Sequence, residues 1–230
     1  MIYVTGDTHG MAARLSPEAL PFTADWTKRD YLIVCGDFGY LYNGTGREEL
    51  FLRELSFRPY YILFVDGNRD NPTLLARYPE TRWHGGRVRR LRRNVIYLMR
   101  GQVYELGGRR IFTMGGGYSI DRARRVEGNS WWLQEMPSAE EYDEARRNLR
   151  AADMRVDTII SHAAPTYAME SISGDYEGER ELNDFLDWVR REVRYQNWYF
   201  GHLHIDAMLD GNLYAMFLSV RQMENGMQIW

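Results

Sequence analysis

The sequence predicts an α/β fold built on a largely parallel sheet. Five short apolar runs are rich in β-branched or aromatic residues, which is typical of buried strands. Helix signals separate the first of these runs, and strands that alternate with helices favour parallel pairing. The expected strands are residues 2–4, 31–34, 60–65, 158–160 and 198–200.

The expected helices are marked by capping residues or by an apolar stripe. Ser138 and Glu141 have the spacing of a capping box, so we expect a helix from there to about residue 154. A later helix is indicated by apolar residues at helical spacing, namely Leu182, Phe185, Leu186, Val189 and Val193. Three earlier signals are Ser16 with Pro17, the apolar positions Leu50, Phe51 and Leu55 after Gly46, and Asn71 with Pro72 before residues 73–78.

The middle and the end of the chain predict antiparallel strands. Residues 95–98, 102–106 and 109–114 are strand-like pieces separated by turn glycines, which predicts a meander. Asp210, Gly211 and Asn212 lie between residues 207–209 and 213–217, which predicts a hairpin. We expect one domain over residues 1–230, with residues 115–137 as an insertion that faces the substrate.

Cysteine content and charge limit the classes of function. Cys35 is the only cysteine, so an intramolecular disulfide and a cysteine zinc site are excluded, and a reducing compartment is expected. The sequence has no leader-like segment and no run of about 20 apolar residues, so we expect a cytoplasmic protein without a membrane partner. The net charge of -3 gives no global signal for nucleic acid. Lys28 is the only lysine, so the many arginines indicate a codon bias more than selected contacts.

Polar residues that can bind metal follow each of the five expected strands. They include four of the five histidines and are Asp7 with His9, Asp37, Asn68 with Arg69 and Asp70, His162, and His202 with His204. Side chains two apart in an extended segment point the same way, so each spaced pair can reach one ion. Ligands gather at the carboxyl ends of parallel strands. One such pair alone is more often an ordinary loop, but the ordered set indicates imidazoles and oxygens that converge on metal ions.

This order resembles the calcineurin-like metallophosphoesterase superfamily, including its bacterial and phage-type members. The family pattern is D-x-H, then G-D, then G-N-H followed by D or E, then a lone H, then G-H-x-H, and the resemblance covers residues 7–204. It implies an α/β fold in the form of a layered αββα sandwich, with mixed sheets and helices on the outer faces. It implies that one metal ion is held by Asp7, His9, Asp37 and His204. A second ion would be held by Asp37, Asn68, His162 and His202.

The implied reaction is hydrolysis of a phosphomonoester or phosphodiester by a hydroxide that bridges two divalent ions. Asp37 would bridge both ions, because a carboxylate has two oxygens. Nitrogen and oxygen donors without sulfur suit transition metals and argue against a calcium or magnesium cage. We expect manganese, with iron, zinc or nickel as alternatives. The expected catalytic residues are Asp37, Asn68, Arg69 and Asp70.

Arg69 departs from the family pattern, which has histidine at this position. Arginine can bind phosphate through two nitrogens but cannot give up a proton in proteins. We therefore expect Arg69 to hold the phosphate and the leaving-group proton to come from Asp70, His84 or water. The alternatives are that Arg69 points into solvent or pairs with Asp70.

The segment after residue 114 is the expected substrate side. Three consecutive glycines, at 115–117, allow a close backbone approach, and Arg122 and Trp131 are the expected substrate contacts, by charge and by stacking. The arginines between residues 82 and 93 are further candidates. The alternative is a tight turn followed by tryptophans that anchor a helix.

Three functions remain open from the sequence. The first is hydrolysis of a phosphate ester that is a small molecule or a nucleotide. The second is cleavage of DNA or RNA, which needs a continuous basic track to the ions and gives strongly salt-dependent binding. The third is a metal-binding interaction scaffold that has lost catalysis.

Overall fold

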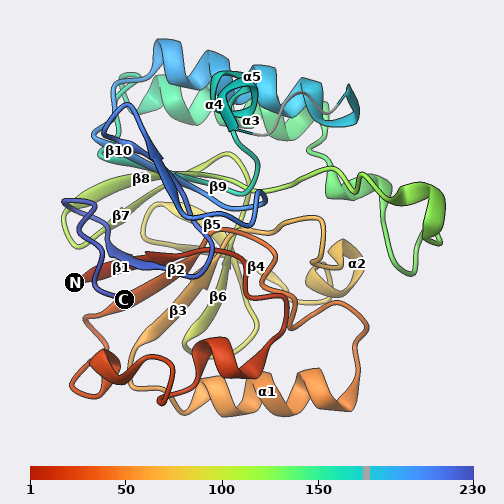
Figure 1. Ribbon diagram of the computed structural model, residues 1–230, viewed down its shortest axis with the longest axis vertical. Coiled ribbons are helices and arrows are strands. Elements are labelled where there is room, and N and C mark those ends of the chain that lie inside the picture. Colours follow the sequence, from red (N-terminus) through yellow and green to blue (C-terminus); the bar gives the residue numbers. More distant parts are fainter. Residues whose placement is uncertain (173–176) are drawn as a thin grey trace.

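Two mixed β-sheets lie face to face, and helices cover the outer face of each sheet (Figure 1). The computed structural model describes residues 1–172 and 177–230. This is the layered αββα arrangement that the sequence implied.

The first sheet has seven strands in the order β13-β1-β2-β3-β6-β5-β4. Its four central strands are parallel, while β13, β5 and β4 are antiparallel to their neighbours. The bounds are β1 (Ile2–Thr5), β2 (Tyr31–Val34), β3 (Tyr61–Phe64), β4 (Glu80–Trp83), β5 (Gly86–Arg90), β6 (Val95–Leu98) and β13 (Val220–Gln222).

The second sheet has six strands in the order β11-β12-β10-β9-β8-β7. Strands β12, β10, β9 and β8 are parallel, and β11 and β7 pair antiparallel at the edges. The bounds are β7 (Gln102–Leu106), β8 (Arg109–Met114), β9 (Thr158–Ser161), β10 (Asn197–Phe200), β11 (Ala207–Leu209) and β12 (Leu213–Ala215).

Five α-helices and five short 3₁₀ helices connect the strands of the described residues. The α-helices are α1 (Gly46–Ser56), α2 (Pro72–Leu75), α3 (Ala139–Ala151), α4 (Thr166–Ile172) and α5 (Arg180–Glu192). The 3₁₀ helices are η1 (Ala12–Leu15), η2 (Pro21–Thr23), η3 (Arg122–Arg124), η4 (Leu133–Glu135) and η5 (Glu177–Glu179). None of these helices combines the length and the apolar composition needed to cross a bilayer.

The alternation of side chains along the strands divides the core into layers. Leu32 and Val34 of β2 pack with Leu52 and Leu55 of α1. Ile33, between them, points into the layer that joins the two sheets. A third cluster lies between the second sheet and its helices α3 and α5. Because central strands are covered on both faces, they appear in the sequence as continuous apolar runs.

Most of the predicted elements are confirmed. All five predicted buried strands are present, as is the hairpin of β11 and β12. Ser138 forms its capping box at the start of α3, and the apolar stripe is buried along α5. Asn71 caps α2, but this helix ends at Leu75, short of the predicted residue 78.

Two predictions were wrong. The meander fails at its first strand, because β6 pairs with β3 and β5 in one sheet whereas β7 pairs with β8 in the other. Ser16 and Pro17 do not begin a helix; they lie in a turn between η1 and η2.

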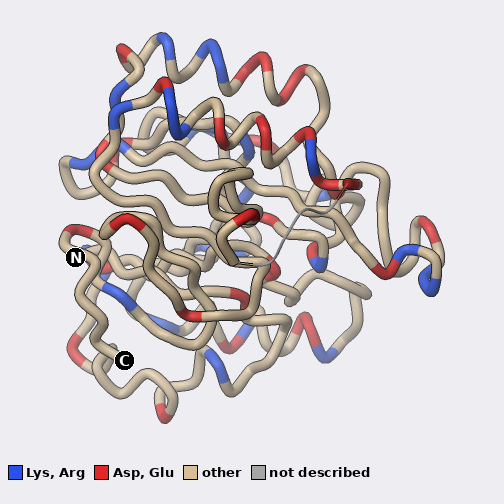
Figure 2. Tube along the Cα trace, turned by 45° about the horizontal axis from the view of Figure 1, so that its top comes forward, with Lys and Arg blue, Asp and Glu red and all other residues tan. Residues whose placement is uncertain are grey.

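The arginine-rich stretch of residues 82–93 includes β5 and its antiparallel partner β4. Its arginines are engaged on the surface: Arg87 and Arg89 pair with Glu80, and Arg92 pairs with Glu49. The tube coloured by charge shows basic and acidic positions interleaved along the chain (Figure 2). Arg87, Arg89 and Arg92 therefore contact the hairpin and its neighbours, and no arginine of residues 82–93 lines the two clefts at the polar clusters described below.

Candidate metal centre

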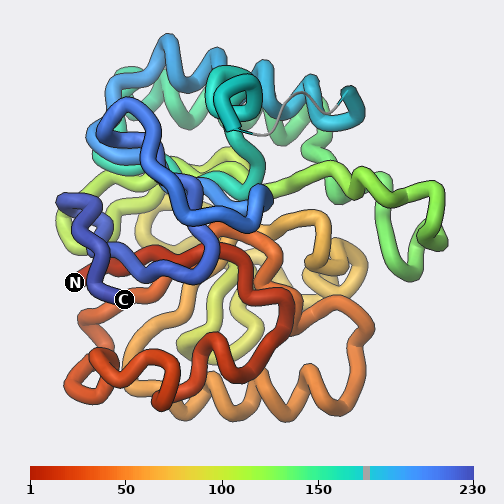
Figure 3. Tube along the Cα trace, viewed as in Figure 1, coloured from red at the N-terminus to blue at the C-terminus, as the bar shows by residue number. Residues whose placement is uncertain are grey.

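All five polar clusters lie at the carboxyl ends of parallel strands from both sheets. Asp7, Asp37 and Asn68 follow β1, β2 and β3 of the first sheet, and His162 and His202 follow β9 and β10 of the second. The sheets present these ends on the same side of the molecule, where segment 115–137 projects from the body (Figure 3). The candidate site therefore spans the junction of the two sheets.

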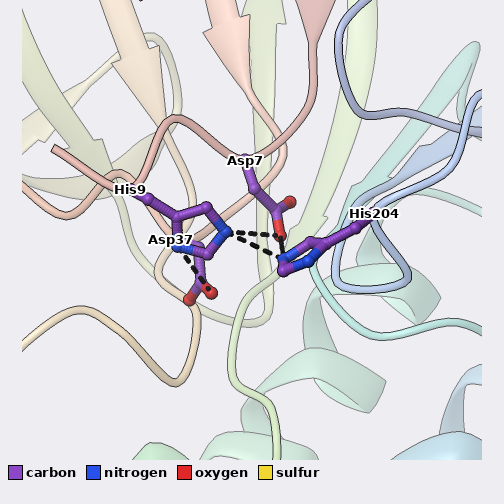
Figure 4. Close-up of side chains that lie close together, drawn as sticks. All are labelled: Asp7, His9, Asp37 and His204. Carbon is purple, nitrogen blue, oxygen red and sulfur yellow. Dashed lines mark hydrogen bonds and ion pairs between the residues drawn. The ribbon is translucent and has the colours of Figure 1, made fainter. Parts of the chain in front are cut away.

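The first donor set consists of Asp7, His9, Asp37 and His204 (Figure 4). One ligand atom from each residue lies within 4.8 Å of the others. His204 Nε2 lies 3.1 Å from Asp7 Oδ2 and 2.8 Å from His9 Nε2. His9 Nδ1 lies 3.6 Å from Asp37 Oδ2. The four residues can therefore reach a single ion.

The second donor set consists of Asp37, Asn68, His162 and His202. His162 Nε2 lies 3.5 Å from Asp37 Oδ1 and 3.3 Å from Asn68 Oδ1. His202 Nδ1 lies 3.1 Å from the same nitrogen of His162. Asp37 thus turns Oδ1 toward this set and Oδ2 toward the first, as a bridging carboxylate requires.

The backbone at the site is held in an unusual conformation. His9, Asp37, His202 and His204 have φ values of 49°, 44°, 67° and 52°. These four are half of the eight non-glycine residues with positive φ in the described chain. Such residues cost about 1–3 kcal/mol each and cluster at functional sites. The fold therefore maintains these side-chain directions at a cost in stability.

Glycines before the ligands allow the segments to approach one another. A Cβ atom on Gly36 would lie 2.1 Å from His162 Nδ1, and one on Gly67 would lie 2.3 Å from Asp37 Oδ1. A Cβ atom on Gly201 would lie 2.2 Å from Asp7 Oδ1. The two sheets can therefore bring their ligands together only with glycine at these positions.

The electrostatics of the site suit a cation. Asp7 and Asp37 are buried, and their ion pairs within the described residues are all with histidines. Burial, and then the negative charge of Asp7, raise the pKa of Asp37 to about 7. Burial lowers the pKa of His9 to about 4. Both pKa shifts show that burial disfavours the charged form of the side chain. A bound cation would stabilise the ionised carboxylate of Asp37.

Glu179 is a buried acidic residue that the sequence prediction missed. Its Oε1 lies 3.1 Å from His202 Nε2 and accepts a hydrogen bond of 2.8 Å from the backbone N–H of Tyr118. Burial alone would raise the pKa of Glu179, but His202 and the hydrogen bonds lower it to about 2. Burial alone would lower the pKa of His202, and Glu179 raises it to about 9. No motif marks this residue, which lies in a charged stretch that begins a helix.

A second buried acid, Glu135, supports Asn68. The Nδ2 of Asn68 donates a hydrogen bond of 3.1 Å to Ser119 Oγ, and this hydroxyl donates to Glu135 Oε2 at 2.9 Å. The backbone N–H of Ser119 also donates to Glu135 Oε1 at 2.7 Å. Because the amide nitrogen of Asn68 is used in this way, its oxygen faces His162.

Arg69 lies at the mouth of the site. Its side chain is 38% exposed, and its Nη2 lies 3.8 Å from Asp121 Oδ2, so the alternative of a pair with Asp70 is wrong. Its backbone N–H donates to Asp37 Oδ1 at 2.7 Å. The side chain therefore lies beside Asp121, where it lines both clefts at the edge of the metal ligands.

Neither Asp70 nor His84, the expected proton donors, lines the two clefts at the metal ligands. Asp70 is buried, and its carboxylate accepts backbone N–H groups of Phe38, Gly39 and Gly67. It therefore holds two ligand loops together. His84 contacts Trp83, whose ring packs on Tyr61 at the amino end of β3, the end opposite the site.

The expected substrate contacts Arg122 and Trp131 pack on each other. Arg122 pairs with Glu135 at 2.7 Å, and its guanidinium lies 4.5 Å from the ring centre of Trp131 and 3.9 Å from that of Tyr118. Neither Arg122 nor Trp131 lines the two clefts at the metal ligands. The alternative, a turn with anchoring side chains, describes them better.

Two clefts meet at His9, Arg69 and His204. The larger has a volume of about 690 Å³ and runs between residues 10–12 and α1, where Tyr42, Arg47 and Phe51 line it. The smaller has a volume of about 360 Å³. Segment 115–137 contributes one wall of it through Tyr118, Ile120, Asp121 and Arg125. Both clefts therefore open from the metal ligands.

A layered sandwich with two adjoining sets of nitrogen and oxygen donors defines a metal-dependent hydrolase. The family model for calcineurin-like phosphoesterases matches residues 1–206, and the chain belongs to this family of hydrolases that act on phosphoester bonds. Enzymes of this family depend on two metal ions, and the donor chemistry found here fits such a pair.

The chain is also similar to a curated protein, the lariat debranching enzyme of Schizosaccharomyces pombe (strain 972 / ATCC 24843). The two are 27% identical over 234 aligned positions, which cover 87% of this chain and 47% of that enzyme. The chain therefore spans about half the length of this relative.

Proposed function

We propose that the protein hydrolyses phosphodiesters with two divalent transition-metal ions, one in each donor set. The observation that carries the proposal is Asp37, whose two oxygens face the two sets. Manganese is the proposed ion, with iron, zinc or nickel as alternatives, because the donors are imidazole, carboxylate and amide oxygen.

The two clefts favour a diester over a monoester. They meet at His9, Arg69 and His204, so a phosphate bound there has room for a substituent on each side. A monoester would occupy only one cleft.

Two bound divalent ions would generate a nucleophile from water at neutral pH and neutralise charge on the phosphoryl oxygens. Asp37 presents one oxygen to each set, and Asn68 and the buried His162 present their donor atoms to the second set. Arg69, at the mouth of both clefts, would donate hydrogen bonds to a phosphoryl oxygen. Water in the open clefts would supply the leaving-group proton, since Asp70 and His84 lie elsewhere.

Cleavage of nucleic acid is the second candidate, and the similarity to a lariat debranching enzyme favours it. Arg47, Arg69 and Arg125 line the clefts and could contact a phosphate backbone. Arg87 and Arg89 of the β4–β5 hairpin do not support a basic track, because both pair with glutamates. Binding of a single-stranded oligonucleotide that weakens steeply with salt would support this candidate.

The experiment is a substrate panel with metal-stripped protein reconstituted with manganese. The panel contains an aryl phosphodiester, an aryl phosphomonoester, cyclic nucleotides and single-stranded DNA and RNA. We expect manganese-dependent hydrolysis of the aryl diester in preference to the monoester. Two bound ions without hydrolysis of any substrate would contradict the proposal and favour the interaction scaffold. Preference for the monoester would contradict the diester assignment alone.

A further inference from the structure

Glu179 meets the second donor set from outside. Its carboxylate lies against the Nε2 edge of His202, while the Nδ1 edge of the same ring faces His162. Glu179 is fully buried, and η5, where it lies, comes from a segment that contributes no ligand to either donor set. It therefore contacts the centre only through His202.

Other groups fix the position of this carboxylate. The backbone N–H of Tyr118 donates to Oε1 at 2.8 Å, and Asn183 Nδ2 donates to Oε2 at 3.1 Å. Asn183 is itself buried and donates to the carbonyl of Ala164 at 2.8 Å. A Cβ atom on Gly178 would lie 2.2 Å from the Tyr118 ring, so η5 packs closely on that residue. The carboxylate has little freedom to rotate.

An ionised carboxylate only accepts hydrogen bonds, so His202 must carry a hydrogen on Nε2 to donate to Glu179. In the neutral ring this leaves the lone pair on Nδ1, the atom that faces His162 Nε2. Carboxylates that bind the distal nitrogen of a metal-ligating histidine fix its tautomer and raise its basicity.

We propose that Glu179 is a positioning residue that orients His202 and selects the tautomer with which it binds the second metal ion. Among the described residues, the partners of Glu179 are His202, Tyr118 and Asn183, none of which belongs to the first donor set, so we expect the first ion to keep its affinity. This inference rests on the two-ion centre of the proposed function. It concerns metal binding and is tested without turnover.

The test is calorimetric titration of metal-stripped protein with manganese, in the wild type and in Glu179→Ala. We expect Glu179→Ala to weaken the second ion about 10- to 100-fold and to leave the first at its wild-type affinity. Glu179→Gln keeps an oxygen that accepts from His202 and should restore most of this affinity. Glu177→Ala is the matched control, because Glu177 lies exposed in the same 3₁₀ turn.

Nitrogen NMR of the zinc-loaded protein provides the second readout. We expect zinc on His202 Nδ1 and a hydrogen on Nε2 in the wild type, and a mixture of nitrogens or loss of zinc in Glu179→Ala. If Glu179→Ala only lowers the melting temperature, with both affinities and the bound nitrogen unchanged, the proposal is overturned. If Glu179→Ala does not fold, the Glu179→Gln variant decides, since binding of zinc through Nε2 of His202 would also overturn it. A wild type that binds two ions without hydrolysing esters would contradict the proposed function and leave this inference standing.

Discussion

The two donor sets share Asp37 but differ in their surroundings. In the first set the side chains of His9 and His204 are 24% and 50% exposed. In the second set the side chain of His162 is fully buried and that of His202 is 11% exposed. The first set is therefore the more exposed of the two, and the second is more buried, with Asn68 and His202 reaching only the smaller cleft.

The two sets also differ in the residues that hold their donor side chains, and the more buried set has more buried polar contacts. The ring contacts of His204 are with His9 and Phe217, whereas His202 and Asn68 are held by buried polar residues of segments 115–137 and 177–183. Outer groups of this kind are worth about 10- to 100-fold in metal affinity. We infer that, in the proposed two-ion centre, the second set is the preformed metal site and the first, which lies beside both clefts, is the more exchangeable one.

The largest expected effect is loss of the bridge. Asp37→Asn leaves one carbonyl oxygen where two carboxylate oxygens faced the two sets, so both ions should bind weakly. We expect kcat/KM for an aryl diester to fall about 10³-fold, together with a loss of bound manganese measured by mass spectrometry. Asp25→Asn, at an exposed position, is the control. Full manganese content in Asp37→Asn would contradict the bridging role.

The next largest effect is expected on stability, at the buried ion pair of Arg100 and Asp66, which we call the anchor of segment 115–137. Arg100 is buried, and its Nη2 pairs with Asp66 Oδ2 at 2.6 Å. It also donates to the carbonyls of residues 134–136, which fixes the end of the projecting segment. Arg100→Ala leaves Asp66 as an unpaired buried charge and should lower the free energy of unfolding by about 3–5 kcal/mol in urea titrations.

A double variant at Arg100 and Asp66 distinguishes the effect of the ion pair from the effect of side-chain packing. Arg100→Met combined with Asp66→Asn leaves no unpaired buried charge, because the second acidic partner of Arg100, Glu141, is 31% exposed, so the double variant should be less destabilising than Arg100→Ala. A loss below about 1 kcal/mol in Arg100→Ala, as expected of a surface pair, would show that the anchor is not needed.

The clustering of the donor residues could be predicted from the sequence, whereas the residues that support them could not. Asp7, Asp37 and His202 follow strand signals directly, so strand prediction and chemistry located them together. Glu179 and Glu135 meet the site only through tertiary packing, and a buried glutamate has no local signal. The sequence shows the charge of Arg122, which suggested a substrate contact, but it does not show that Arg122 pairs with the buried Glu135.

The assignment of these strands to two different sheets could not be predicted for a related reason. Residues 95–98 and 102–106 are both short strand signals on either side of a turn glycine, and the change from one sheet to the other occurs between them. Pairing partners depend on which faces are covered, and this is not encoded in one strand.

A smaller effect is expected at the mouth of the open set. Arg69→Ala removes charged hydrogen bonds to the phosphate worth about 1.5–3 kcal/mol, so kcat/KM should fall about 10- to 150-fold with both ions retained. Arg69→His should improve alkyl diesters relative to aryl diesters, because histidine can supply a leaving-group proton. Kinetics on matched aryl and alkyl substrates provide the measurement.

Arg124→Ala is the control for Arg69, because Arg124 is exposed on the projecting segment and does not line either cleft. An unchanged leaving-group preference in Arg69→His would contradict the assignment of Arg69 as a clamp without acid function.

The smallest effect is expected from Ser119→Ala, which tests whether the residues behind Asn68 influence the second ion alone. Ser119→Ala removes the acceptor for Asn68 Nδ2, which lets the amide rotate and present its nitrogen to the metal. The loss should be about 1 kcal/mol, or about fivefold in the affinity of the second ion, measured by the same calorimetric titration. Ser130→Ala on the same segment is the control, since its hydroxyl accepts from the backbone of Val126. Equal weakening of both ions would show that the two sets are coupled through Asp37, and the contrast between a preformed and an exchangeable site would then fail.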